Sequence, residues 1–144
     1  MRAFIFTFFM AYAIFGYGQA TDFVKWRASY DKVSSSIIIK ATMKDKWVIY
    51  SQHTDDDGPI PTEFEFHTTE GVTFEGDVIE VTPPIEIMSE MFGVMVRKFK
   101  KEAVFRQEIK NAVAGSSVKG NITFMTCDDT KCLPPETVPF VVNF

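Results

Sequence analysis

The chain is poor in residues that bind metals. Its 144 residues include two cysteines and two histidines, and the histidines, His53 and His67, lie far from both cysteines in sequence. A structural zinc site needs four such ligands, and a catalytic one needs three. We therefore expect no metal site and no cofactor.

The chain also lacks an excess of positive charge. It has 15 Lys and Arg against 19 Asp and Glu and a formal charge of −4, and we expect no basic patch. Nucleic acids and anionic lipid surfaces attract proteins with basic patches. We therefore expect protein or small-molecule partners and no nucleic acid.

No apolar run is long enough to span a bilayer as a helix. The longest, residues 3–15, follows Arg2 and precedes the small-residue stretch 16–20. A spanning helix needs about 20 apolar residues, so an uncleaved anchor is the weaker interpretation. The pattern is typical of a signal peptide. We predict that residues 1–20 are one, cleaved near Gly18 to Ala20, and that the mature domain is 21–144.

Beyond Asp22 no long stretch has helical periodicity. Residues 36–43 alternate, with Ile37, Ile39 and Ala41 on one parity, which is typical of a half-buried strand. Gly, Pro, Asp and Ser interrupt further runs of this kind. The predicted strands are 36–43, 47–51, 62–67, 72–75, 94–99, 103–109, 118–126 and 138–144. We expect one all-β domain of about eight or nine strands.

The two cysteines, Cys127 and Cys132, are four residues apart, between a predicted strand and Pro134-Pro135. A disulfide closing so short a loop stabilises by only about 2 kcal/mol. A domain of this size does not need one to fold. Strand parity places Cys127 with Lys119 and Thr123, away from the core. A structural bond, a redox pair and a metal site all remain open on spacing alone.

The stretch 127–137 (CDDTKCLPPET) resembles the active-site hairpin of the N-terminal periplasmic domain of the thiol:disulfide interchange protein DsbD. Residues 44–51 (KDKWVIYS) look like that family's aromatic strand beside the site, and 89–93 (SEMFG) like its cap loop. The resemblance spans the mature chain, and the cysteine element is its specific part.

The resemblance implies an immunoglobulin-like β-sandwich with an active-site cysteine hairpin and a cap loop. It implies that Cys132 forms the mixed disulfide with a partner and that Cys127 resolves it. Phe92, or its neighbour Met91, would shield the bond. Lining the site would be Trp47 and Tyr50, with Glu90 as the cap carboxylate.

The family role is a redox relay, so the resemblance implies that the chain is a thiol:disulfide oxidoreductase. Such domains take electrons from a membrane-embedded donor and pass them to periplasmic thioredoxin-fold proteins that serve disulfide isomerisation or cytochrome c maturation. The chain ends at Phe144, so we expect another chain to supply the donor, and we expect a monomer in the periplasm. The rival interpretation is a non-catalytic immunoglobulin-like binding domain with a structural hairpin disulfide.

The sequence also departs from the family pattern. The loop between the cysteines has four residues where the best-known members have five, which could alter the redox potential of the bond. Ser89 stands where an acidic residue is expected, which leaves Glu90 as the cap carboxylate.

Overall fold

The computed structural model describes residues 19–55, 57–67 and 70–144. In this part of the chain the one helical piece is a 3-10 turn, η1 (Ala20–Asp22), and the strands are numbered to β11. The prediction of an all-β chain is confirmed, with more strands than expected. The predicted signal peptide lies almost wholly outside the described residues.

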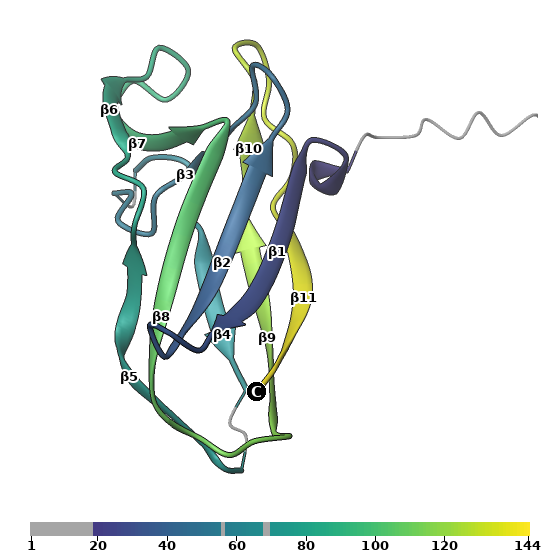
Figure 1. Ribbon diagram of the computed structural model, residues 1–144. Helices are drawn as coiled ribbons and strands as arrows, with labels where there is room; N and C mark the ends of the chain where they lie inside the picture. Colours follow the sequence, from purple (N-terminus) through teal and green to yellow (C-terminus); the bar gives the residue numbers. More distant parts are fainter. Residues whose placement is uncertain (1–18, 56, 68–69) are drawn as a thin grey trace, which may run out of the picture.

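Two sheets form the body of the sandwich (Figure 1). The first has the order β1-β2-β8-β5: β1 (Val24–Asp31), β2 (Ser36–Met43), β8 (Glu102–Ala112) and β5 (Val72–Glu80). The second has the order β11-β9-β4: β11 (Glu136–Asn143), β9 (Ser117–Phe124) and β4 (Glu63–Phe66).

The main core lies between these two sheets, because both sheets supply its fully buried residues. Ile37 and Ile39 come from β2, Phe105 from β8, and Ile122 and Phe124 from β9. Apart from the buried Ser36 before Ile37, the neighbours of these residues along their strands are more exposed. The alternation on which the strand predictions rest therefore reports the core face directly.

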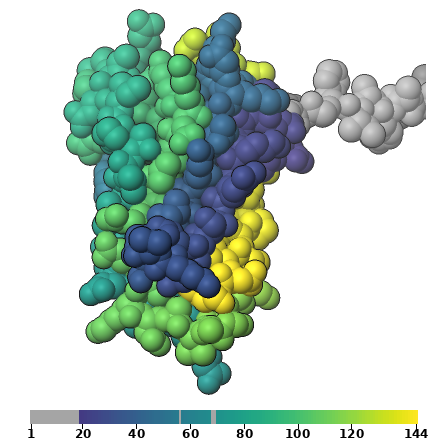
Figure 2. Space-filling model, in the orientation of Figure 1, coloured from purple at the N-terminus to yellow at the C-terminus, as the bar shows by residue number. Residues whose placement is uncertain are grey.

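A third sheet sits at one end of the sandwich and carries the cysteines. Its order is β10-β3-β7-β6: β10 (Thr126–Cys127), β3 (Val48–Tyr50), β7 (Met95–Lys100) and β6 (Ile85–Met88). Both Figures 1 and 2 show the cap loop after β6 and the hairpin after β10 at this same end.

The predicted continuous strand 118–126 is wrong at Met125. The chain leaves the ladder there: β9 pairs with β11 and β4, whereas β10 pairs with β3. The alternation of buried and exposed residues along β9 therefore does not extend to Cys127. Cys127 is 1% exposed, not on an exposed polar face.

Replacing Phe105 by Ala tests the main core. The Phe105 side chain is fully buried among Phe64, Phe99 and Trp26, so its loss should lower the free energy of unfolding by about 3–5 kcal/mol. Urea unfolding measures this value. Val33→Ala, at a 96% exposed position, is the control and should change it by less than about 0.5 kcal/mol. A similar loss for both variants would contradict the assigned core.

Candidate functional site

The base of the cysteine hairpin is anchored on both sides. Thr126 donates a hydrogen bond from Oγ1 to the carbonyl of Val48 at 2.8 Å, and Leu133 donates its backbone N–H to the carbonyl of Thr126 at 3.0 Å. Leu133 is 9% exposed and belongs to the main core. The four residues between the cysteines therefore project from a fixed base.

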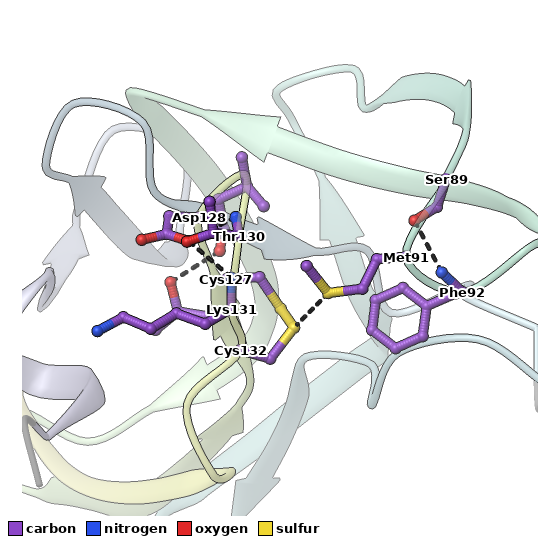
Figure 3. The surroundings of a disulfide bond; sticks show 10 residues. Ser89, Met91, Phe92, Cys127, Asp128, Thr130, Lys131 and Cys132 are labelled. Atoms are coloured by element: carbon purple, nitrogen blue, oxygen red, sulfur yellow. Dashed lines mark hydrogen bonds between the residues drawn. A yellow bond between two sulfur atoms is a disulfide. The ribbon is translucent and has the colours of Figure 1, made fainter.

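The loop has its own hydrogen-bonded frame, drawn in Figure 3. Asp128 Oδ1 accepts the N–H groups of Thr130 and Lys131, each at 2.8 Å, and the Thr130 hydroxyl at 2.9 Å. The Asp128 N–H in turn donates to the Lys131 carbonyl at 2.9 Å. The hydrogen bond from the Thr130 N–H, then that from Lys131, lowers the pKa of Asp128. The loop thus keeps a defined shape without help from the sulfurs.

Cys127 and Cys132 form a disulfide whose two sulfurs have different surroundings. Their Cα atoms are 4.0 Å apart. Cys127 is buried in a second cluster with Val48, Tyr50 and Val96, whereas Cys132 is only half-buried. A nucleophile arriving from solvent therefore meets the Cys132 sulfur first.

The cap loop between β6 and β7 covers that sulfur. Gly93 donates its N–H to the carbonyl of Ser89 at 2.8 Å and has φ 71°, a conformation that glycine adopts without strain. This turn places Met91 Sδ 3.3 Å from Cys132 Sγ (Figure 3). The disulfide sulfur carries no proton, so this is a van der Waals contact.

Phe92 supports the cap from the inner side. Its ring is half-buried and meets the Tyr50 ring edge to face, with centroids 6.1 Å apart and planes at 86°. Met91 is 46% exposed. Of the two residues expected to shield the bond, Met91 therefore makes the sulfur contact and Phe92 fixes the loop that carries it.

Strand β3 decides which aromatic residues reach the disulfide, because both of its faces are buried. Ile49 and the preceding Trp47 point into the main core, where Trp47 stacks on Phe23 at 4.0 Å. Val48 and Tyr50 point to the other face and join the cysteine cluster. The structure therefore brings Tyr50 to the site but not Trp47, and it adds Val48, which shares Tyr50's parity.

A shallow cavity of about 290 Å³ separates the cap from the hairpin. Its lining includes Tyr50 and Met91 from the site, Glu90 on the exposed cap, and charged groups from other elements, which are Lys46, Lys98, Asp128 and Asp129. Burial raises the pKa of Tyr50 to about 12. Within the described residues no group of three His, Cys, Asp or Glu side chains could hold a metal ion.

Comparison with known proteins identifies the fold and the family. The family model described as thiol:disulfide interchange protein DsbD, N-terminal, matches residues 20–143. This chain belongs to the DsbD N-terminal domain family. No curated protein sequence matches it.

Solved structures agree with the family assignment. The reduced DsbD N-terminal domain of Neisseria meningitidis has a TM-score of 0.65 and 15% identity, covering 88% of this chain and 89% of that one. The complex of the Neisseria DsbD and PilB N-terminal domains has a TM-score of 0.60 and 15% identity, with coverage of 82% and 80%.

The N-terminal periplasmic domain of ScsB from Proteus mirabilis has a TM-score of 0.53 and 20% identity. It covers 81% of this chain and 44% of its own. At these identities the likeness shows the fold, so the predicted immunoglobulin-like sandwich is confirmed for this DsbD N-terminal domain. In the described residues no helix is long and apolar enough to cross a membrane.

The buried phenol of Tyr50 provides a pH test of the cysteine cluster. Because its pKa is raised from 10.0 to about 12, the folded state binds the phenol proton more tightly than the unfolded state does. The stability from this group should be complete below pH 10 and should fall as pH rises toward 12. Absorbance titration at alkaline pH should show one phenol with a pKa of about 12. Its persistence in Tyr50→Phe would contradict the assignment.

Proposed function

We propose that this DsbD N-terminal domain is a redox relay that exchanges its Cys127–Cys132 disulfide with the thiols of partner proteins. It takes two electrons from a membrane-embedded thiol donor and passes them to thioredoxin-fold proteins of the periplasm, without a cofactor. The observation that carries the proposal is the asymmetric disulfide: one sulfur is buried, and the other lies half-exposed under a single cap residue.

Reduction of the domain takes two exchange steps. A donor thiolate attacks Cys132 Sγ, the bond to Cys127 breaks, and the Cys127 thiolate leaves. The second donor thiolate then attacks the donor sulfur of the mixed disulfide and releases Cys132. The donor ends as a disulfide, and the domain ends as a dithiol after its two sulfurs take up two protons from water.

Reduction of the acceptor reverses the roles. The Cys132 thiolate attacks the acceptor disulfide and forms a mixed disulfide, and one acceptor sulfur leaves as a thiolate. The Cys127 thiolate then attacks Cys132 Sγ, which restores the intramolecular bond and frees the second acceptor sulfur. Cys127 suits this resolving step because β10 holds it in the same hairpin as Cys132.

The frame of the hairpin favours exchange over a purely structural bond. Hydrogen bonds that the Asp128 carboxylate accepts, and the one that Leu133 donates to Thr126, already hold the loop. The disulfide therefore adds only the loss of unfolded-chain entropy, about 2 kcal/mol for so short a loop. A hairpin of this kind can lose and regain the bond without unfolding.

The cap is proposed to select which thiols reach Cys132 Sγ. Met91 Sδ lies 3.3 Å from Cys132 Sγ, so it covers part of the approach to this sulfur, and an arriving partner can displace it. Glu90 is exposed on this cap and lines the adjoining cavity, so protons it supplies would reach the sulfurs through water.

Export to the periplasm is part of the proposal, with the signal peptide cleaved after Gly18. This bond is preferred to the one after Ala20 because Ala20 is 2% exposed and packs in the main core. In addition, Thr21 donates its N–H and its hydroxyl to the Glu136 carboxylate, each at 3.0 Å.

Trapping with a defined partner tests the relay. A thioredoxin-fold protein whose second active-site cysteine is changed to Ser should form a mixed disulfide with the oxidised domain. Mass mapping should place the bond on Cys132, because Cys127 is only 1% exposed and Cys132 is the less buried cysteine. Cys127→Ala, loaded with the partner's intact disulfide form, should accumulate the same adduct.

Cys132→Ala is the matched control and should form no adduct. A mixed disulfide through Cys127 would contradict the assigned roles. So would the absence of an adduct from both the unmodified domain and Cys127→Ala. A disulfide that also resists reduction in thiol buffers far below the compartment's potential would favour the non-catalytic binding domain.

Shortening the cap side chain should make the disulfide easier to attack. Met91→Ala removes the sulfur contact, and losing about 1 kcal/mol of closed-state contacts should speed reduction by dithiothreitol about fivefold. Met95→Ala is the control, since Met95 is a similarly exposed methionine on β7. Equal rates for Met91→Ala and the unmodified domain would argue against a cap role.

A further inference from the structure

Five lysines converge beside the cysteine hairpin, although they come from two separate segments. Lys44 and Lys46 lie in the β2–β3 turn, and β7 with the residue after it contributes Lys98, Lys100 and Lys101. The antiparallel β3–β7 ladder places Lys100 opposite Val48 and Lys98 opposite Tyr50. The N–H of Met43 donates to the Lys101 carbonyl at 2.8 Å. We call these five residues the lysine surface.

The lysine surface adjoins the tip of the hairpin. Four of its members line a cavity of about 210 Å³ together with Trp47, Asp45 and the hairpin residue Asp129. The β2–β3 turn, the end of β7 and the hairpin lie at one end of the molecule (Figures 1 and 2). A protein whose cysteine reaches Cys132 therefore approaches the end of the molecule where the lysine surface lies.

Positive charge is concentrated here against the sign of the whole chain. The surface holds five of the 15 Lys and Arg in a chain whose formal charge is −4. In the described part of the chain, none of the five is within ion-pair distance of a carboxylate. Burial, then the charge of Lys100, lowers the pKa of Lys98, and the charge of Asp129 opposes this.

The negative groups nearby do not cancel this charge evenly. Asp45 and Asp129 face the cavity with four lysines. On the cap side of the hairpin, Glu90 and the Asp128-Asp129 pair face Lys46 and Lys98. The side away from the cap is therefore the basic one, and it corrects the prediction that the chain has no basic patch.

We propose that the lysine surface docks partner proteins whose reactive cysteine is flanked by carboxylates. This rests on the proposed function, because it describes the partner that exchanges with Cys132. Opposite charges around the reacting sulfurs speed the encounter of the two proteins and orient them, and salt screens this attraction. Acidic protein is favoured over anionic lipid because the surface borders the disulfide, where a membrane would block a partner.

Two dithiol peptides measure the preference directly. Each carries Cys-Gly-Pro-Cys, flanked by glutamates in one and by lysines in the other. We expect the glutamate peptide to reduce the oxidised domain about tenfold faster per thiolate at low ionic strength. At 0.5 M salt the difference should fall to about twofold or less, because the Debye length drops below about 5 Å. A lysine peptide that is equally fast or faster overturns the proposal.

Matched variants assign the effect to these residues. Lys46→Gln/Lys100→Gln should remove most of the preference. Lys32→Gln/Lys110→Gln makes the same charge change at exposed positions in the β1–β2 turn and near the end of β8 and should retain it. The β1–β2 turn and the end of β8 lie at the opposite end of the molecule (Figure 1). Equal losses in both variants would mean that only net charge matters, and they would overturn the assignment.

Peptides with both cysteines changed to Ser separate docking from exchange. In NMR titrations at low salt the glutamate version should shift the backbone amides of residues 44–46 and 98–101, and the lysine version should not. Absence of these shifts overturns the docking proposal, whatever the exchange rates. Shifts without any exchange from the cysteine peptides would leave docking standing and would overturn the redox function instead.

Vesicles provide the remaining comparison. Co-sedimentation of the domain with phosphatidylglycerol vesicles at 0.15 M salt, lost in Lys46→Gln/Lys100→Gln, would assign the surface to lipid and overturn a protein partner. Failure to co-sediment, together with the peptide shifts, supports the proposal.

Discussion

The pairing of β10 with β3 is the interaction on which the site depends. At Met125 the chain leaves the sheet that packs the main core, and two residues later Cys127 lies opposite Val48. This places a sulfur against a strand that is buried on both faces, because Trp47 and Ile49 fill the main core from its other side. The disulfide therefore packs on the face of β3 that points away from the main core.

That placement separates the disulfide from the residues that stabilise the fold. The main core, the Asp128 frame and the Leu133 anchor hold the hairpin in position. Cys132 is left half-exposed beneath Met91, which belongs to a loop at the edge of the small sheet. A bond that contributes little to folding, on a base held by other contacts, suits the exchange proposed above.

Different parts of the site were predictable to different degrees. Residues 36–43 alternate cleanly, and the strand found there has the predicted ends because one of its faces is buried and the other is not. The hairpin and the cap are local segments whose residues stand together in sequence, so the sequence could name them as candidates. It could not place Trp47, because β3 has no solvent-facing side and an all-apolar strand gives no sign of which parity faces which cluster.

The sequence by itself determined the all-β class, the family and the cysteine hairpin, because alternation and a short motif are local properties of the chain. Tertiary structure decided which sulfur is buried, which residue covers the other, and where positive charge gathers. Each of these depends on segments about 40 to 80 residues apart in sequence being brought together by the ladders of the third sheet: Cys132 with Met91, Cys127 with Val48, and Lys46 with Lys100. No pattern within any one segment specifies such a meeting, since strand pairing depends on the whole sheet.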